Sequence, residues 1–189
     1  MLSKNNKYFM KRKKIVFLVG GSGLIGKEVE KILDTKFYKV INLDIKKSGR
    51  KHIYFDCSKT DTIEHNLNLI TRKYQVPDVL INCSYPIAGD WIKNDFNNIK
   101  KKLMKENLEC HLLSYSIISN FVAKKMRKKK KKGKIILFSS IYGFLGQNSN
   151  NYFGTKIKEN VTYSIIKGGI LSLIKQMAAF YGKYNLEIN

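Results

Sequence analysis

The chain has 189 residues, of which 43% are hydrophobic and 12% aromatic, enough apolar material to bury the core of one globular domain. Its apolar runs, such as residues 15–19, are too short for a transmembrane helix, and because that run enters a glycine loop we also reject a signal peptide. The formal net charge of +22 suggests a nucleic-acid partner, but the lysines are scattered along the whole chain, so we expect no nucleic-acid binding.

The cysteines and the densest basic run indicate no special site. Cys57, Cys83 and Cys110 are an odd number without metal-ligand spacing, which argues against a disulfide framework and a zinc site. We therefore expect no bound metal, no membrane contact and a reducing, cytoplasmic location. The basic run 127–132 precedes Gly133, where cations favour a helix C-terminus and point into solvent.

Apolar strand-like runs alternate with helical stretches along the chain, an order that predicts βαβ units and a parallel sheet covered on both faces. Strands are predicted at residues 15–19, 40–44, 53–56, 79–82 and 134–139. Helices are predicted at about 24–33, 60–73, 98–127 and 161–181, with a surface excursion at 147–160.

We expect one α/β domain over residues 1–189, a Rossmann-type doubly wound parallel sheet in three αβα layers. Residues 186–189 resemble a strand that has just begun. The expectation from that ending is a truncated chain whose sheet lacks its remaining C-terminal strands.

A glycine-rich segment, Val19-Gly-Gly-Ser-Gly-Leu-Ile-Gly26, lies between the first predicted strand and the first helix. A tight turn there brings backbone N–H groups and a helix N-terminus against a pyrophosphate. Asp44, at the end of the second strand, can accept the ribose hydroxyls of NAD and would repel the 2′-phosphate of NADP, although Lys46 and Lys47 follow it. We predict a dinucleotide site that prefers NAD over NADP; a helix-capping turn without a ligand is the alternative.

Tyr163 and Lys167 are four residues apart on the last predicted helix, so they project from the same face. A nearby ammonium favours the phenolate, which suits a tyrosine for exchanging a proton with a carbonyl or hydroxyl oxygen. A second pair with this spacing, Tyr152 and Lys156, lies in the aperiodic excursion, where rigid presentation is not expected. We therefore assign the acid/base role to Tyr163 and Lys167.

Six features follow one another along the chain: the glycine loop, Asp44, Asp56, Asn82, the Ser139-Ser140 pair and Tyr163/Lys167. In these features the chain resembles the short-chain dehydrogenase/reductase family from Lys14 to its end. The resemblance implies that Ser140, rather than Ser139, bonds the substrate oxygen, and that Lys167 also holds the nicotinamide ribose. It implies a cofactor site that consists of Gly20, Ser22, Gly23, Leu24, Ile25, Gly26, Asp44, Asp56, Cys57, Asn82, Tyr163 and Lys167.

The chain departs from that family's pattern at three places. Val19 replaces a threonine, and the usual Asn-Ala-Gly reads Asn82-Cys83-Ser84, followed by Tyr85-Pro86. Counting back from Gly133 places His111 where the family has a catalytic-set asparagine, with Asn107 one turn earlier on the same face. Either His111 or Asn107 then holds the proton-relay water, and the alternative for His111 is a buried packing residue.

The segments 139–146, 168–171 and 178–185 resemble, more narrowly, the flagellin-modification branch, whose members are associated with surface sugars. We therefore expect an oxidoreductase that interconverts an alcohol and a ketone, on a sugar or sugar nucleotide. The alternatives are a 3-oxoacyl-type carbonyl reductase and a non-catalytic nucleotide-binding protein. Relatives commonly pair their two long helices, which implies a homodimer or homotetramer through apolar positions that include Leu108, Leu112, Ile170 and Ile174.

Overall fold

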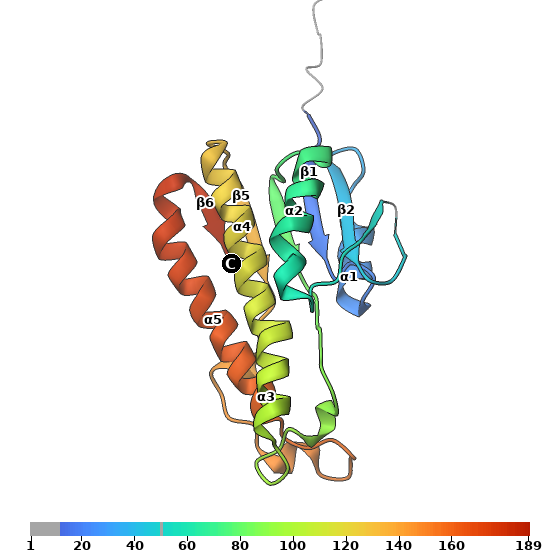
Figure 1. The fold of residues 1–189 in the computed structure, drawn as a ribbon, viewed down its shortest axis with the longest axis vertical. Helices are drawn as coiled ribbons and strands as arrows, with labels where there is room; N and C mark the ends of the chain where they lie inside the picture. The colour runs from blue at the N-terminus through green and yellow to red at the C-terminus, as the bar shows by residue number, and fades with distance from the viewer. Residues whose placement is uncertain (1–11, 50) are drawn as a thin grey trace, which may run out of the picture.

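Parallel strands form a single sheet in the computed structural model, which describes residues 12–49 and 51–189 (Figure 1). The sheet order is β3-β2-β1-β4-β5-β6, and every neighbouring pair is parallel. The strands are β1 (Lys14–Val19), β2 (Tyr38–Asp44), β3 (His52–Tyr54), β4 (Val79–Asn82), β5 (Gly133–Leu137) and β6 (Leu186–Ile188). The order reverses between β1 and β4, and ligands of open α/β sheets bind in the crevice at that point.

Alternate residues of β1 enter two different cores, which confirms a sheet covered on both faces. Ile15, Phe17 and Val19 belong to the larger core, whereas Val16 and Leu18 belong to a smaller one. This division follows from the two-residue period of a strand, and burial on both faces explains why β1 is almost entirely apolar. The three-layer, doubly wound α/β fold expected from the sequence is therefore correct.

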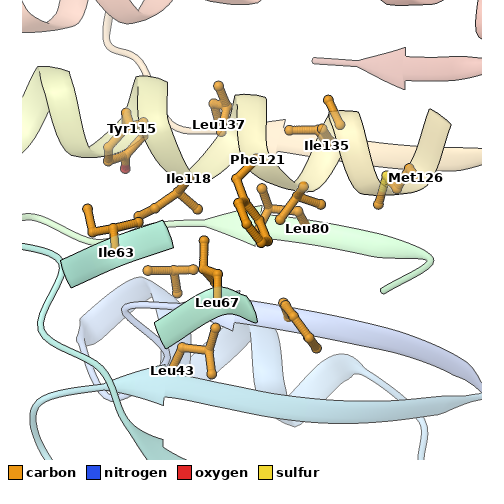
Figure 2. Packing of buried hydrophobic residues seen from close by; sticks show 14 of the residues in the cluster. Leu43, Ile63, Leu67, Leu80, Tyr115, Ile118, Phe121, Met126, Ile135 and Leu137 are labelled. Carbon is orange, nitrogen blue, oxygen red and sulfur yellow. The ribbon is translucent and has the colours of Figure 1, made fainter. Parts of the chain in front are cut away.

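The larger core lies between the sheet and three helices, α2 (Thr60–Tyr74), α4 (Ser114–Lys128) and α5 (Val161–Tyr181). Figure 2 shows Ile118 and Phe121 of α4 packed toward Leu80 of β4, with Leu67 of α2 beside them. Helix α1 (Leu24–Ile32) contributes Val29 to the smaller core on the other face. No helix within residues 12–49 and 51–189 is long and apolar enough to cross a bilayer.

The long helix predicted at 98–127 is the one element whose form the sequence did not reveal. It begins as α3 (Lys101–Asn107), widens into a π-helical turn at Leu108–Leu113 and continues as α4. A π turn inserts one extra residue, and a shift of one residue within a long apolar pattern is too short a signal to locate from sequence. Short 3-10 turns at Trp91–Lys93, Ile141–Gly143, Ser149–Tyr152 and Gly182–Tyr184 occupy the connections.

Apolar residues that suggested a contact between two copies of the chain belong to its own core. Ile170 is fully buried, and Leu108, Leu112 and Ile174 pack against the same cluster. Helices α4 and α5 lie side by side, and a Cβ atom at Gly169 of α5 would come within 2.7 Å of Leu112. These four residues therefore close the core of one chain and do not by themselves indicate a partner.

Candidate active site

A cavity of about 610 Å³ opens where the sheet order reverses. Its walls come from the glycine loop after β1, from Asp44 and Asp56 after β2 and β3, and from Tyr163 and Lys167 on α5. Because the strands are parallel, their carboxyl ends meet at one edge of the sheet, so residues far apart in the sequence share this cavity.

Two glycines of the loop are required by close backbone approach. Gly20 has a φ of +76°, and a Cβ atom there would lie 2.5 Å from the Cα of Ser84. A Cβ atom at Gly26 would collide with the carbonyl oxygen of Gly20. Gly20, Ser22, Gly23, Leu24 and Ile25 line the cavity. Gly26 does not line it, so its direct contribution is the close packing of α1 against the loop.

Asp44 connects the glycine loop to the segment after β2. Its carboxylate accepts hydrogen bonds from the N–H of Ser22 and the N–H of Lys46, each at 2.9 Å. The Ser22 hydroxyl donates to the carbonyl of Lys46 at 2.6 Å. Each carboxylate oxygen can accept more than one hydrogen bond, so Asp44 keeps acceptor capacity toward the cavity that it lines.

Asp56 and Cys57 also line the cavity. The Asp56 carboxylate accepts hydrogen bonds from the N–H and the hydroxyl of Ser58, at 3.0 and 2.6 Å. Burial raises the pKa of Cys57 to about 11, so this thiol is neutral at physiological pH.

Asn82 does not line the cavity, contrary to the sequence-based expectation. Its side chain is fully buried, and its amide oxygen accepts hydrogen bonds from the N–H and the hydroxyl of Ser84, at 3.2 and 2.7 Å. The reason is local: the amide oxygen is used to hold the segment at Ser84, and the amide nitrogen is buried without a partner among the described residues. Asn82 therefore shapes the cavity wall through Ser84, which does line the cavity.

Lys167 is a buried ammonium surrounded by aromatic rings. Only 4% of the residue is exposed, and its Nζ donates to the carbonyl of Phe138 at 2.8 Å. Nζ lies 5.6 Å from the ring centre of Tyr85, 5.9 Å from that of Tyr115 and 5.7 Å from that of Tyr163. Within the described part of the chain no carboxylate forms an ion pair with it, and burial lowers the pKa of Lys167 to about 8.

Tyr163 lies in the first turn of α5, where its position is fixed by a helix cap. Asn160 accepts a hydrogen bond from the backbone N–H of Tyr163 at 2.8 Å. In contrast, Tyr152 lies in a 3-10 turn, does not line the cavity, and donates its hydroxyl proton to Gln147 at 3.0 Å. Lys156 lies in the exposed loop that follows. Of the two pairs with the same spacing, only Tyr163 and Lys167 line the cavity together.

The two serines after β5 have different hydrogen-bond partners. Ser139 lines the cavity, but its hydroxyl donates to the carbonyl of Lys167 at 2.7 Å. The hydroxyl of Ser140 accepts from the N–H of Tyr142 at 3.2 Å, and no hydrogen bond among the described residues uses its proton. The Ser140 proton is therefore free to donate, whereas the Ser139 proton is already engaged, but of the two serines only Ser139 lines the cavity.

Asn107, just before the π turn, and His111, within it, differ in their hydrogen bonding. The Asn107 amide bonds both the N–H and the carbonyl of Ala88, at 2.8 and 3.0 Å, and also the carbonyl of Leu103 at 2.9 Å. His111 is fully buried, and neither ring nitrogen has a partner within residues 12–49 and 51–189. Burial, with a smaller effect of Lys167, lowers the pKa of His111 to about 3, so the imidazole is neutral.

Sequence reasoning missed two aromatic residues of the site. Tyr115, on α4, is fully buried, and its hydroxyl lies 3.0 Å from the carbonyl of Asn82 and 2.9 Å from that of Ser84. Tyr85, on the loop after β4, lines the cavity beside Tyr163. The departure at residues 82–86 was the available signal for Tyr85, because this tyrosine directly follows the altered Asn82-Cys83-Ser84 segment.

Comparisons with known proteins identify relatives of this chain. A family model described as short chain dehydrogenase matches residues 14–189. Post-translational flagellin modification protein A of Campylobacter coli is 28% identical over an alignment of 196 positions, gaps included. This alignment covers 95% of this chain and 76% of that protein. The 3-oxoacyl-[acyl-carrier-protein] reductase FabG of Vibrio cholerae is 25% identical over 187 residues, 93% of this chain and 70% of the relative.

Among solved structures, a short chain dehydrogenase from Leptospira borgpetersenii with bound NAD+ superimposes with a TM-score of 0.79 and 27% identity. The match covers 100% of this chain and 73% of that structure. The chain therefore spans about three quarters of the length of these proteins.

Replacing Lys167 by Met is expected to raise the melting temperature of the protein at pH 7, because it removes a buried ammonium that has no ion-pair partner. Burial lowers the pKa of Lys167 from 10.5 to about 8, so between these values the unfolded chain binds more protons than the folded one. The wild type therefore gains stability as pH rises through this window. The advantage of Lys167→Met should shrink in melts recorded at about pH 10. A variant that melts lower than wild type at pH 7 would contradict this expectation.

Proposed function

We propose an activity for this chain on the basis that it belongs to the short chain dehydrogenase family of oxidoreductases. The proposed activity is the NAD(H)-dependent interconversion of an alcohol and a ketone. One observation carries it: a single cavity is lined by a glycine loop suited to a pyrophosphate and by the Tyr163/Lys167 pair suited to proton transfer.

The residues around the cavity suit a nicotinamide dinucleotide. The glycine loop has no side chain at its closest approaches, and no side chain caps the N-terminus of α1, which leaves its first N–H groups available to phosphate oxygens. We assign Asp44 to the adenosine ribose and Asp56 and Cys57 to the region of the adenine. When bound, the cofactor supplies or accepts the hydride that moves at the substrate carbon. The related structure from Leptospira, which holds NAD+, supports this choice of cofactor class.

In this proposal Tyr163 moves the proton. During reduction its hydroxyl donates to the developing alkoxide, and during oxidation its phenolate accepts the proton of the alcohol. The Lys167 ammonium, desolvated among three rings, stabilises that phenolate and also bonds the nicotinamide ribose. Ser140 donates its unused proton to the same substrate oxygen.

His111 is proposed to pass the proton onward through a water molecule. Its two ring nitrogens have no partner among the described residues, and Lys167 is close enough to lower its pKa. A neutral imidazole has one donor and one acceptor nitrogen, which is what a water-mediated relay requires. Asn107 is less suited to this role, because its amide is bonded to Ala88 and Leu103.

A sugar or sugar nucleotide is the proposed substrate, supported by the likeness to a flagellin modification protein. The likeness to a 3-oxoacyl-[acyl-carrier-protein] reductase supports carbonyl reduction of an acyl chain as the second candidate. A non-catalytic nucleotide-binding protein would bind the dinucleotide without hydride transfer to any ketone.

We further propose a cytoplasmic enzyme that assembles as a homodimer or homotetramer. The support for assembly is the set of apolar side chains that remain exposed on the π turn and on α5, namely Leu113, Ile165 and Phe180.

Replacing Tyr163 by Phe should lower turnover on the order of 100-fold and leave cofactor affinity unchanged, because only the hydroxyl is lost. Tyr152→Phe is the matched control and should keep normal turnover. NADH oxidation with a panel of ketones, combined with NADH titration, measures both quantities. A Tyr163→Phe enzyme that turns over normally would overturn the proposed mechanism.

NADH should bind more tightly than NADPH, because the Asp44 carboxylate repels a 2′-phosphate in a partly desolvated site. Asp44→Asn removes the charge at constant size and should shrink the ratio of the two dissociation constants on the order of tenfold. Asp90→Asn, an exposed aspartate outside the cavity, is the control and should leave the ratio unchanged. Equal affinity of the wild type for both cofactors would contradict the assignment of Asp44.

His111→Leu tests the relay against a packing role. If His111 passes protons, the leucine variant should lose turnover on the order of tenfold or more without losing stability, since two unpartnered buried nitrogens are replaced by an apolar side chain. His111→Asn provides an amide that can hold the water and should retain more of the activity. Melting curves and rates on both variants separate the two roles, and normal turnover of His111→Leu would exclude the relay.

A further inference from the structure

The loop that carries Tyr85 is anchored along its length. The Asn107 amide bonds both backbone groups of Ala88, at 2.8 and 3.0 Å, which holds the loop against the helix that contains the π turn. The Tyr115 hydroxyl lies 2.9 Å from the carbonyl of Ser84, and the Cys110 thiol lies 3.7 Å from that of Pro86. Tyr85 is therefore presented from a backbone that is bonded on both sides of it.

The Tyr85 ring is held by aromatic neighbours at its edges. The ring of His111 meets it at 5.1 Å with an interplanar angle of 83°, and Trp91 meets it at 5.8 Å and 86°. These are edge-to-face contacts, which fix the plane of the ring. Lys167 Nζ lies 5.6 Å from the ring centre, so one side of Tyr85 faces the buried ammonium.

Despite these contacts 47% of Tyr85 remains exposed, and the residue lines the cavity. Its ring centre lies 6.1 Å from that of Tyr163. A substrate whose reacting oxygen bonds the Tyr163 hydroxyl would therefore have the rest of its body next to the Tyr85 ring.

The phenol of Tyr85 adds a hydrogen-bond donor to this apolar surface. Burial, followed by Tyr163, raises the pKa of Tyr85 to about 12, so the phenol keeps its proton at physiological pH. No side-chain hydrogen bond within residues 12–49 and 51–189 uses that proton, so it stays available to a ligand. An apolar face beside a hydroxyl donor is complementary to a ring that has C–H bonds on one face and oxygens at its edge.

We propose that Tyr85 is a specificity-determining residue that packs its ring against the C–H face of a cyclic polyol substrate and donates its hydroxyl proton to one of that substrate's oxygens. An acyclic ketone has no such face and gains little from this contact. The inference rests on the proposed function, and it deepens it by selecting cyclic carbohydrates over open-chain acyl groups.

The test compares three ketones of six carbons in the full chain, with NADH oxidation as the readout. 2-Keto-myo-inositol offers a ring and hydroxyls, cyclohexanone offers a ring alone, and 2-hexanone offers neither. Tyr85→Ala should lower kcat/KM for both cyclic ketones on the order of tenfold relative to 2-hexanone, mainly through KM, because any change around Lys167 affects all three ketones alike. Tyr85→Phe should lower kcat/KM for 2-keto-myo-inositol alone, because only the donor is lost.

Two controls separate this role from a structural one. Tyr85→Leu retains side-chain volume in the loop, and it should reproduce the alanine pattern with a normal melting temperature. Phe180→Ala, at an aromatic residue of α5 that is 45% exposed and lies outside the cavity, should change none of the three rates relative to one another. Equal losses for all three ketones in Tyr85→Ala would overturn the inference while the activity stands. A wild type that reduces none of these ketones, or other carbonyls, would overturn the proposed function itself.

Discussion

The site depends on one buried cation. Lys167 has its ammonium among three tyrosine rings and one backbone carbonyl, with no carboxylate partner in the described part of the chain. A carboxylate beside it would stabilise the charge, but it would also compete for that charge with any anion that enters the cavity. Rings and a carbonyl are weaker partners, so the ammonium remains able to respond to a new anion in the cavity. Burial lowers the pKa of Lys167, which means that keeping this ammonium charged in the folded protein costs stability.

Other elements of the site follow from this constraint. The cage requires an aromatic residue from α4, another from the loop after β4 and Tyr163 from the same helix as Lys167, so α4, β4 and α5 must converge at one edge of the sheet. The π turn before α4 and the unpartnered nitrogens of His111 lie within this convergence. Both features cost stability, and in folded proteins such features concentrate at functional sites, where substrate and water complete the hydrogen bonds.

The glycine loop and Asp44 form a second group that is more nearly local. Ser22 and Lys46 both donate backbone N–H groups to the carboxylate, so the loop after β1 and the loop after β2 hold each other in place. The steric demands on Gly20 and Gly26 arise from backbone that lies close by in this arrangement. In the proposed function this half of the cavity binds the dinucleotide and the half around Lys167 moves a proton. The parallel sheet joins the two halves because its strand ends meet at one edge.

The sequence by itself determined the order of strands and helices, and it pointed to residues that line the cavity, namely the glycine loop, Asp44 and Tyr163 in place of Tyr152, because periodicity, glycine placement and helical spacing are local properties. The family resemblance suggested Ser140, and counting back from Gly133 suggested His111. Only the tertiary structure decided that Asn82 bonds Ser84 and does not line the cavity, that Asn107 bonds Ala88, that a π turn interrupts the long helix and that Tyr85 contributes a ring to the surroundings of Lys167. The physical reason is that these features arise where β4, α4 and α5 pack together, and no local pattern records contacts between segments that far apart in the chain.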